Sequence, residues 1–267
     1  MGQLRQALDE AGGEKKTLVL AVDGSFCNRT VFTTGAERTE ILARARKDAI
    51  LCFRAPKGSG RFYGWNKFTP EWVMREDAIP WQKAKIFYGG KRRPVRYKDI
   101  TAVYWQGGAR RRTLRLFVVA PTPYKKRKSG RFYYRRPAFL LTTDVAGHAR
   151  TLLQIYFDRW QIEVNHRDEK DTLGVGQAQL WNPVSVPKQP AMAVASYSAL
   201  LLASLIAFGA ERGAAYAPLP KWRRNAKRPS CLDLITLLRK EIGEQPGRVR
   251  FLGINPSFQG FTSAAAA

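Results

Sequence analysis

The middle of the chain restricts the fold more than any other part. Residues 85–143 consist of short runs rich in β-branched and aromatic residues, such as "RTLRLFVVA" and "AFLLTT", separated by Gly-Gly pairs, prolines and basic turns. Such runs are typical of β-strands joined by turns, and none keeps the apolar spacing of a helix. We therefore predict an antiparallel β-rich module here, which excludes an all-helical protein.

The same region carries most of the positive charge. Between Arg54 and Arg136 there are 23 Lys or Arg and four acidic residues, so this stretch supplies +19 of the net +25. Cations interleaved with aromatic residues suit contact with phosphates and stacking on bases. Nucleic acid is the expected partner, and an anionic membrane surface is the alternative. The adjacent cations selected as DNA contacts are Arg92, Arg93, Arg111, Arg112, Lys125 and Lys126.

The segments on either side of the β module differ from it. The continuous apolar run "TLVLAV", residues 17–22, fits a strand buried on both faces of a parallel or mixed sheet. "TEILARA", residues 39–45, is a second strand candidate. Helices are expected over about 146–172, 190–210 and 231–243, and the fold class is therefore α/β. Asp23 follows the first strand, where side chains often meet ligands, although Asp-Gly is also a common turn pair.

Four chemically distinct residues share one stripe if 146–172 is a single helix. Tyr156, Arg159, Glu163 and Lys170 then fall within an arc of about 60°. One interpretation is a salt-bridged surface helix, because Arg159 and Glu163 are four residues apart. The other is a carboxylate flanked by phosphate-binding groups.

The spacing Tyr156-x2-Arg159-x3-Glu163-x6-Lys170 matches the Y-R-E-K signature of DDE transposases of the insertion-sequence-four class. The segment "LAVDGSFCNRTVF" resembles the second-aspartate motif of this family, and "ILARARKDAILCF" resembles the strand that follows it. The basic β module lies where the family inserts a β domain before the glutamate helix. The resemblance extends over nearly the whole chain.

This resemblance implies a ribonuclease-H-like catalytic core, with the β domain inserted and helices at the C-terminus. It implies two-metal phosphoryl transfer with Mg²⁺, or Mn²⁺, on double-stranded DNA at transposon ends. By position, Asp23 and Glu163 correspond to metal ligands, whereas Tyr156, Arg159 and Lys170 correspond to contacts with the DNA backbone. The complete enzyme would work as a homodimer with DNA. In relatives that flip a base, an aromatic of the β domain stacks on it, and Trp105, Tyr133 and Tyr134 are candidates.

The first aspartate of the family has no clear counterpart. Its strand should precede the Asp23 strand by two strands and a helix, but only 22 residues precede Asp23. Asp9 is expected on a solvated helix, and if Asp23 were the first aspartate, the second would have to be Asp48, Asp99 or Asp144. We favour a core that is incomplete at the N-terminus and inactive alone. The predicted parts are residues 1–54 (partial core), 55–143 (β insertion), 144–215 (glutamate helix and buried helix) and 216–267 (C-terminal helix and tail).

Three functions remain open: a transposase fragment, a non-catalytic DNA-binding remnant, and a basic membrane-associated protein. Residues 191–210 are long and apolar enough to span a membrane, but their Ala and Ser content favours a buried core helix. Cys27, Cys52 and Cys231 have neither disulfide nor zinc spacing and indicate a reducing compartment. The expected location is therefore the cytoplasm, at the nucleoid, with no membrane partner.

Overall fold

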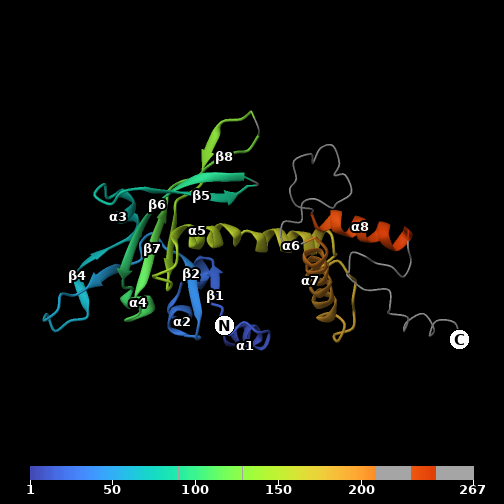
Figure 1. Ribbon diagram of the computed structural model, residues 1–267, viewed down its shortest axis with the longest axis horizontal. Coiled ribbons are helices and arrows are strands. Elements are labelled where there is room, and N and C mark those ends of the chain that lie inside the picture. The colour runs from blue at the N-terminus through green and yellow to red at the C-terminus, as the bar shows by residue number, and fades with distance from the viewer. Residues whose placement is uncertain (90, 128, 209–229, 245–267) are drawn as a thin grey trace. The chain divides into compact units, whose positions relative to one another are not determined.

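The computed structural model describes residues 1–89, 91–127, 129–208 and 230–244. The chain divides into two compact units, residues 1–160 and 161–267. Figure 1 shows the sheet of the first unit and the helices of the second.

A mixed six-stranded sheet organises the first unit. Its strand order is β1-β2-β10-β7-β6-β5. β1 and β2 are parallel, and every other neighbouring pair is antiparallel. The strands are β1 (Leu18–Val22), β2 (Thr39–Ala45), β5 (Gln82–Tyr88), β6 (Lys91–Val103), β7 (Leu114–Val119) and β10 (Ala138–Thr142). The α/β class is therefore confirmed, as are the strands predicted at 17–22 and 39–45.

The burial of the strand residues explains this strand order. Every residue of β7 is buried, which suits a strand with neighbours on both sides and layers above and below. All five residues of β1 are only half-buried, and β1 stands at one end of the sheet. Among the described residues, no backbone group pairs with the outer edge of β1. This edge is thus open to a further strand.

Two layers cover the sheet. Helix α5 (Ala149–Asp158) packs on one face, with Leu152 and Leu153 against Ile86, Phe117 and Leu140 of the strands. The other face is covered by short helices and a hairpin, and its core includes Phe32, Leu51, Val73 and Leu116. The covering elements are α2 (Arg29–Thr33), α3 (Pro70–Arg75), α4 (Gln106–Ala109) and the pair β3 (Leu51–Arg54) and β4 (Tyr63–Phe68). Helix α1 (Gly2–Glu10) precedes β1.

The β insertion is not a separate body. β5, β6, β7 and β10, all within the predicted 55–143 module, are antiparallel, as expected, but β10 pairs directly with β2 of the predicted core. The first compact unit accordingly runs through the predicted boundaries at 54 and 143 to Trp160. Among the strands of the described ranges, only the two-stranded pairs β3–β4 and β8–β9, with β8 at Pro123–Lys125 and β9 at Phe132–Tyr134, lie outside the main sheet.

A buried ion pair fixes the start of α5. Arg115 on β7 donates from Nε and Nη2 to the two carboxylate oxygens of Asp99 on β6, at 2.8 and 2.6 Å. Its Nη1 donates to the carbonyl of Gly147 at 2.6 Å, just before α5 begins. Both side chains are about nine-tenths buried. The hydrogen bond from Arg115 therefore joins the sheet to the helix that carries Tyr156.

We expect Arg115→Ala to lower the free energy of unfolding by about 3–5 kcal/mol, because it leaves the Asp99 carboxylate buried without its partner. Urea denaturation monitored by circular dichroism measures this change. Arg75→Ala is the matched control, since Arg75 forms an exposed ion pair with Glu71 and its loss should change stability little. Equal effects of the two substitutions would contradict the anchoring role of Arg115.

The predicted helix over 146–172 is interrupted, which corrects the single-stripe interpretation. α5 ends at Asp158, Arg159 and Trp160 form a turn, and α6 (Gln161–Asp171) begins as a separate helix. The boundary between the two compact units falls at the same place. The spacing therefore does not place Tyr156 and Glu163 on one continuous helical face.

In the second unit, α6 packs with α7 (Lys188–Phe208) and α8 (Cys231–Glu244). Tyr197 donates to the Oδ1 atom of Asn165 on α6 at 2.9 Å, and Leu200 and Leu234 are buried between α7 and α8. The helix predicted at 190–210 is confirmed as far as Phe208, and α8 is confirmed. Residues 209–210 and the predicted tail after Glu244 lie outside the described residues.

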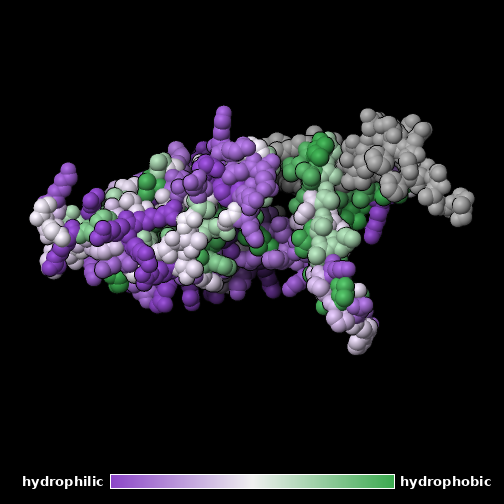
Figure 2. Space-filling model, turned by 90° about the horizontal axis from the view of Figure 1, so that it is seen from below, coloured by the Kyte–Doolittle hydropathy of each residue, from purple (hydrophilic) through white to green (hydrophobic). Residues whose placement is uncertain are grey.

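The burial expected for α7 is wrong for most of its surface. Leu202 is 58% and Ile206 67% exposed, and hydrophobic side chains form a continuous surface over α7 (Figure 2). By length and composition, the segment Lys188–Ala207 is the one helix among the described residues that could cross a membrane. Helix α6 and helix α8 therefore cover only part of this apolar helix.

We expect the purified chain to partition with soluble or aggregated material, because α7 makes specific contacts with α6 and α8. Replacing the exposed Leu202 and Ile206 by Glu should raise the soluble fraction, whereas Leu200→Glu, at a buried site, should lower it. Fractionation with an alkaline wash measures this. Wild-type protein that resists the wash in the membrane pellet would favour a membrane-associated role instead.

Candidate functional site

Asp23 lies at the carboxyl end of β1, beside the open edge of the sheet. It caps the short 3₁₀ turn Gly24–Phe26, and its Oδ1 atom accepts a hydrogen bond from the Ser25 backbone N–H at 2.9 Å. The backbone and side-chain hydrogen bonds of Ser25 lower the pKa of the Asp23 carboxyl, and the Arg159 charge lowers it further. Asp23 is therefore ionised at neutral pH, while its side chain is reachable from solvent.

Arg159 is brought towards Asp23 by the packing of α5. Helix α5 crosses the sheet face and contacts both β5 and β1, and Arg159 follows its last residue, where its charge acts on the Asp23 carboxyl. These two residues are separated by 136 positions in the sequence, and both had been selected from the sequence as site residues. The structure thus brings two of the predicted site residues into one electrostatic environment.

Tyr156 lies on the same helix but belongs largely to the core. It is half-buried, packs with the cluster between α5 and the sheet, and meets the Phe157 ring edge-on at 5.8 Å between centroids. A contact between its hydroxyl and DNA stays a prediction.

Glu163 and Lys170 lie on α6 in the second unit. Both are exposed, and their separation of seven residues places them on one side of that helix. Glu163 occupies the first turn, where the helix dipole favours a carboxylate. His166, on the same helix, is exposed and contacts Glu169 at 3.2 Å.

The other aspartates considered from the sequence have structural roles. Asp9 was expected to be solvated, but it accepts from the buried Arg5 and from Arg38, which ties α1 to the residue before β2. The Arg5 hydrogen bond lowers the pKa of Asp9. Asp99 holds Arg115, and Asp144 caps the turn before α5 by accepting from the Gly147 N–H at 2.6 Å. Asp48 pairs with Arg46 at 2.6 Å.

Individual carboxylates are the possible metal ligands of this site. In the described part of the chain, no three His, Cys, Asp or Glu residues gather as a metal site. Asp23 is an accessible, ionised oxygen donor of the kind Mg²⁺ prefers. The three cysteines are free thiols; Cys52 and Cys231 are buried, and burial raises the pKa of the half-buried Cys27 to about 11. These thiols are therefore protonated and are not suited to metal binding or nucleophilic attack at neutral pH.

The basic residues fall into two classes, those that are held inside the protein and those that are exposed to solvent. Lys98 is fully buried and donates to the carbonyls of Val73 and Glu76, and Arg115 is held by Asp99. These cations cannot contact DNA. Among the predicted contacts, Arg112 is half-buried and lies 3.7 Å from Glu40, whereas Arg111 is exposed.

The six predicted DNA contacts lie at three places. Arg92 and Arg93 pair with the end of β5, and Arg111 and Arg112 precede β7, beyond the far end of β6. β6 continues for ten residues after Arg93, so these two pairs are separated by about 33 Å of strand at ~3.3 Å per residue. Lys125 and Lys126 lie on the β8–β9 hairpin beyond the other end of β7.

The β8–β9 hairpin contains further basic and aromatic residues that the six selected positions omit. Arg131 lies 4.8 Å from the Tyr133 ring centroid, as does Lys126, and Lys125 lies 4.5 Å from that of Phe132. Arg135 follows β9 and faces the rings of Tyr124 and Trp160. No Asp or Glu occurs between Asp99 and Asp144. The run "RFYYRR", residues 131–136, was the sequence pattern from which these further basic and aromatic residues could have been selected.

The three aromatic candidates for base stacking have different environments. Trp105 packs against the core cluster and meets Phe32 edge-on at 5.7 Å, so it is a core residue. Tyr133 is half-buried and stacks near Tyr124 at 5.6 Å. Tyr134 is 67% exposed and is the accessible member of the three.

Comparison of the chain with known protein families and with curated proteins finds no match in either. The functional assignment therefore depends on the residues and on their arrangement.

Proposed function

We propose that this chain is part of a DDE-type transposase that cleaves and joins double-stranded DNA at transposon ends. The observation that carries the proposal is the position of the Asp23 carboxylate after the open strand β1, where the Arg159 charge also acts on it. A metal-binding carboxylate beside a phosphate-binding guanidinium is what phosphoryl transfer to or from DNA requires. The proposed fold of the core is ribonuclease-H-like.

Each residue of the motif has a proposed task. Two Mg²⁺ ions, when bound, supply activation of the attacking oxygen and stabilisation of the leaving oxygen. Asp23 and Glu163 would hold the metal through their carboxylates. Arg159 and Lys170 donate hydrogen bonds to phosphate oxygens, with the planar Arg159 suited to bidentate contact. The Tyr156 hydroxyl donates to the DNA backbone.

A third carboxylate is proposed to come from outside residues 1–267. The open edge of β1 supports this, because a strand paired there would present its side chains beside Asp23. We further propose a homodimer on DNA in the complete enzyme, in the cytoplasm at the nucleoid. A non-catalytic DNA-binding protein is the second candidate, and it is favoured by the basic stretch between Asp99 and Asp144, which contains no acidic residue.

The chain alone, with Mg²⁺ or Mn²⁺, should not cut the DNA that flanks its gene, because two carboxylates do not hold the metal pair at the required spacing. Addition of the polypeptide encoded upstream of Met1 should restore cutting. Cleavage is measured on end-labelled duplexes. Metal-dependent cleavage by the chain alone that Asp23→Ala abolishes would overturn the proposed incompleteness, and inactivity of the combined pieces would favour the non-catalytic candidate.

A further inference from the structure

The β3–β4 hairpin is a second basic projection of the first unit. β3 and β4 pair with each other, with a bulge between Cys52 and Arg54, and not with the main sheet. Cys52 and Tyr104 exchange backbone hydrogen bonds of 3.0 and 2.8 Å, which anchor the hairpin beyond the end of β6. Leu51 and Cys52 are buried at this base, so the hairpin has a fixed origin.

We define the hairpin-tip patch as six exposed residues that extend from Lys67, opposite Cys52 at the base of the hairpin, to Lys57 in its loop, together with the neighbouring Arg111: Arg54, Lys57, Arg61, Trp65, Lys67 and Arg111. No Asp or Glu occurs between Asp48 and Glu71. In the ranges that the structure describes, none of the five cations of the patch forms an ion pair. Their neighbours Arg46, Lys47 and Arg75, by contrast, all pair with carboxylates. The patch therefore presents uncompensated positive charge.

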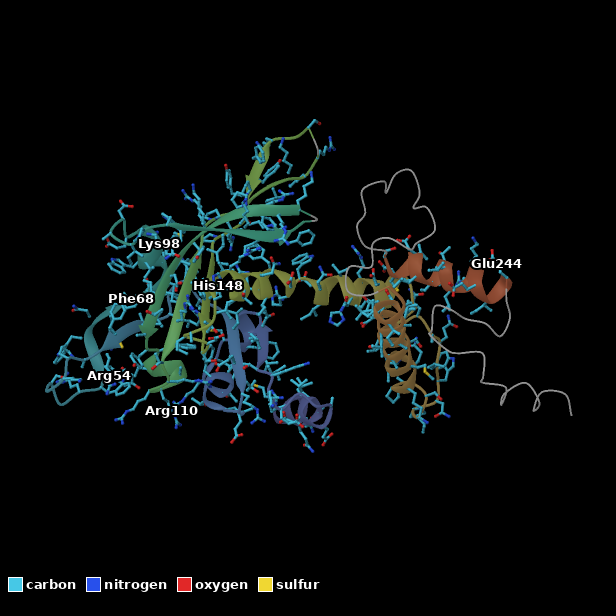
Figure 3. The ribbon with its side chains drawn as sticks, viewed as in Figure 1. Arg54, Phe68, Lys98, Arg110, His148 and Glu244 are labelled. Carbon is cyan, nitrogen blue, oxygen red and sulfur yellow. The ribbon has the colours of Figure 1, made fainter. Side chains whose placement is uncertain are left out.

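Aromatic rings hold the arginines of the patch. The Arg61 guanidinium lies 3.6 Å from the Trp65 ring centroid, which is stacking distance, although Trp65 is 70% exposed. Arg54 and Arg111 lie 5.2 and 5.1 Å from the centroid of Phe62. Figure 3 shows Arg54 on the hairpin and Arg110, the neighbour of Arg111, at the same end of the unit. A stacked guanidinium keeps its in-plane N–H groups directed outward for an anion.

The loop between the strands has the conformation that exposes these cations. Gly58 and Gly60 adopt φ values of +87° and +67°, which other residues rarely adopt. The Ala55 N–H donates to the Phe62 carbonyl at 3.0 Å and closes the loop. The backbone thus holds Lys57 and Arg61 at the tip.

We propose that the hairpin-tip patch binds the phosphates of duplex DNA as a second contact surface, separate from the β8–β9 hairpin. This deepens the proposed function and rests on it. The ring of Trp65 already stacks with Arg61. The patch is therefore better suited to contact phosphates through its oriented cations than to stack a base on an open ring. The two hairpins adjoin opposite ends of β7, whose six residues span about 20 Å, or roughly six base pairs of duplex.

The test is the triple substitution Lys57→Ala, Arg61→Ala and Lys67→Ala in the full chain. Affinity for a 30-base-pair duplex should fall roughly 10- to 100-fold at 0.1 M salt. The slope of log affinity against log salt should become about three units shallower, since each phosphate contact contributes about 0.9. Fluorescence anisotropy measures both quantities. Trp65→Ala should weaken binding several-fold with little change in slope, and Trp65→Tyr should restore binding.

The matched control is Arg46→Ala, Lys47→Ala and Arg75→Ala, which removes the same charge from cations that are already paired. An equal loss of DNA affinity in both triple variants would show that the patch is not a binding site and that its cations act only through long-range electrostatics. Wild-type affinity in the hairpin variant, with steep salt dependence retained, would overturn the inference but not DNA binding. Failure of the wild-type chain to bind duplex would contradict DNA binding itself. Binding to vesicles containing phosphatidylserine, but not to DNA, would assign the patch to a membrane surface.

Thermal unfolding midpoints within two or three degrees of wild type, about what loss of an exposed side chain costs, establish that the variants are folded.

Discussion

In the reaction restored by the upstream polypeptide, Asp23→Ala and Glu163→Ala are each expected to slow DNA cleavage by more than about 100-fold. Loss of a residue that only supports a metal ligand costs about 10- to 100-fold, so loss of a ligand should cost at least as much. The rate of strand cleavage under single-turnover conditions measures the effect. Affinity for DNA should stay near the wild-type value, because neither carboxylate attracts phosphate.

Two controls make this result specific. Asp48→Ala removes an exposed aspartate paired with Arg46, and Glu244→Ala removes an exposed glutamate near Lys240. Both should leave the rate unchanged. Arg159→Ala should reduce the rate less than Asp23→Ala does, and Arg159→Lys should restore part of it, because lysine keeps the charge but not the bidentate geometry. Full activity of Asp23→Ala would contradict the proposed site at the end of β1.

The second large effect concerns the β8–β9 hairpin. Replacing Lys125, Lys126, Arg131 and Arg135 by Ala should lower affinity for duplex DNA roughly 100-fold or more at 0.1 M salt, and should make the salt slope about four units shallower. The physical reason is that these cations lie in a stretch without any acidic residue, so their removal is not offset by a nearby carboxylate. Anisotropy titrations from 50 to 200 mM salt measure both values.

The control for this variant removes four paired, exposed cations, namely Arg46, Lys47, Arg75 and Lys240. Its affinity should fall far less. Point substitutions are used rather than a deletion of residues 55–140, because such a deletion would remove strands of the central sheet, which contains β5, β6, β7 and β10. An unchanged salt slope in the hairpin variant would show that DNA is bound elsewhere.

Local pattern was sufficient for several elements. β1 follows from the continuous apolar run at 17–22 and β2 from the strand candidate at 39–45, and α7 and α8 follow from long segments with helical composition. The antiparallel character of residues 85–142 was also predicted, because turn residues and alternating strands are encoded over a few positions. Asp23 and Arg159 could be selected from the sequence, since one ends a strand and the other belongs to a spaced motif.

Other features depend on contacts between distant positions. The sequence by itself determined the strands, the helices, the location of the positive charge and the motif residues, all of which depend on near neighbours. Only the tertiary structure decided that β10 pairs with β2, that the helix is interrupted at Arg159 and Trp160, and that Asp99 rather than DNA neutralises Arg115. It also decided that α7 remains largely exposed and that two basic hairpins adjoin opposite ends of β7. The physical reason is that strand pairing and burial are set by which surfaces meet across long stretches of sequence, and no local spacing specifies that choice.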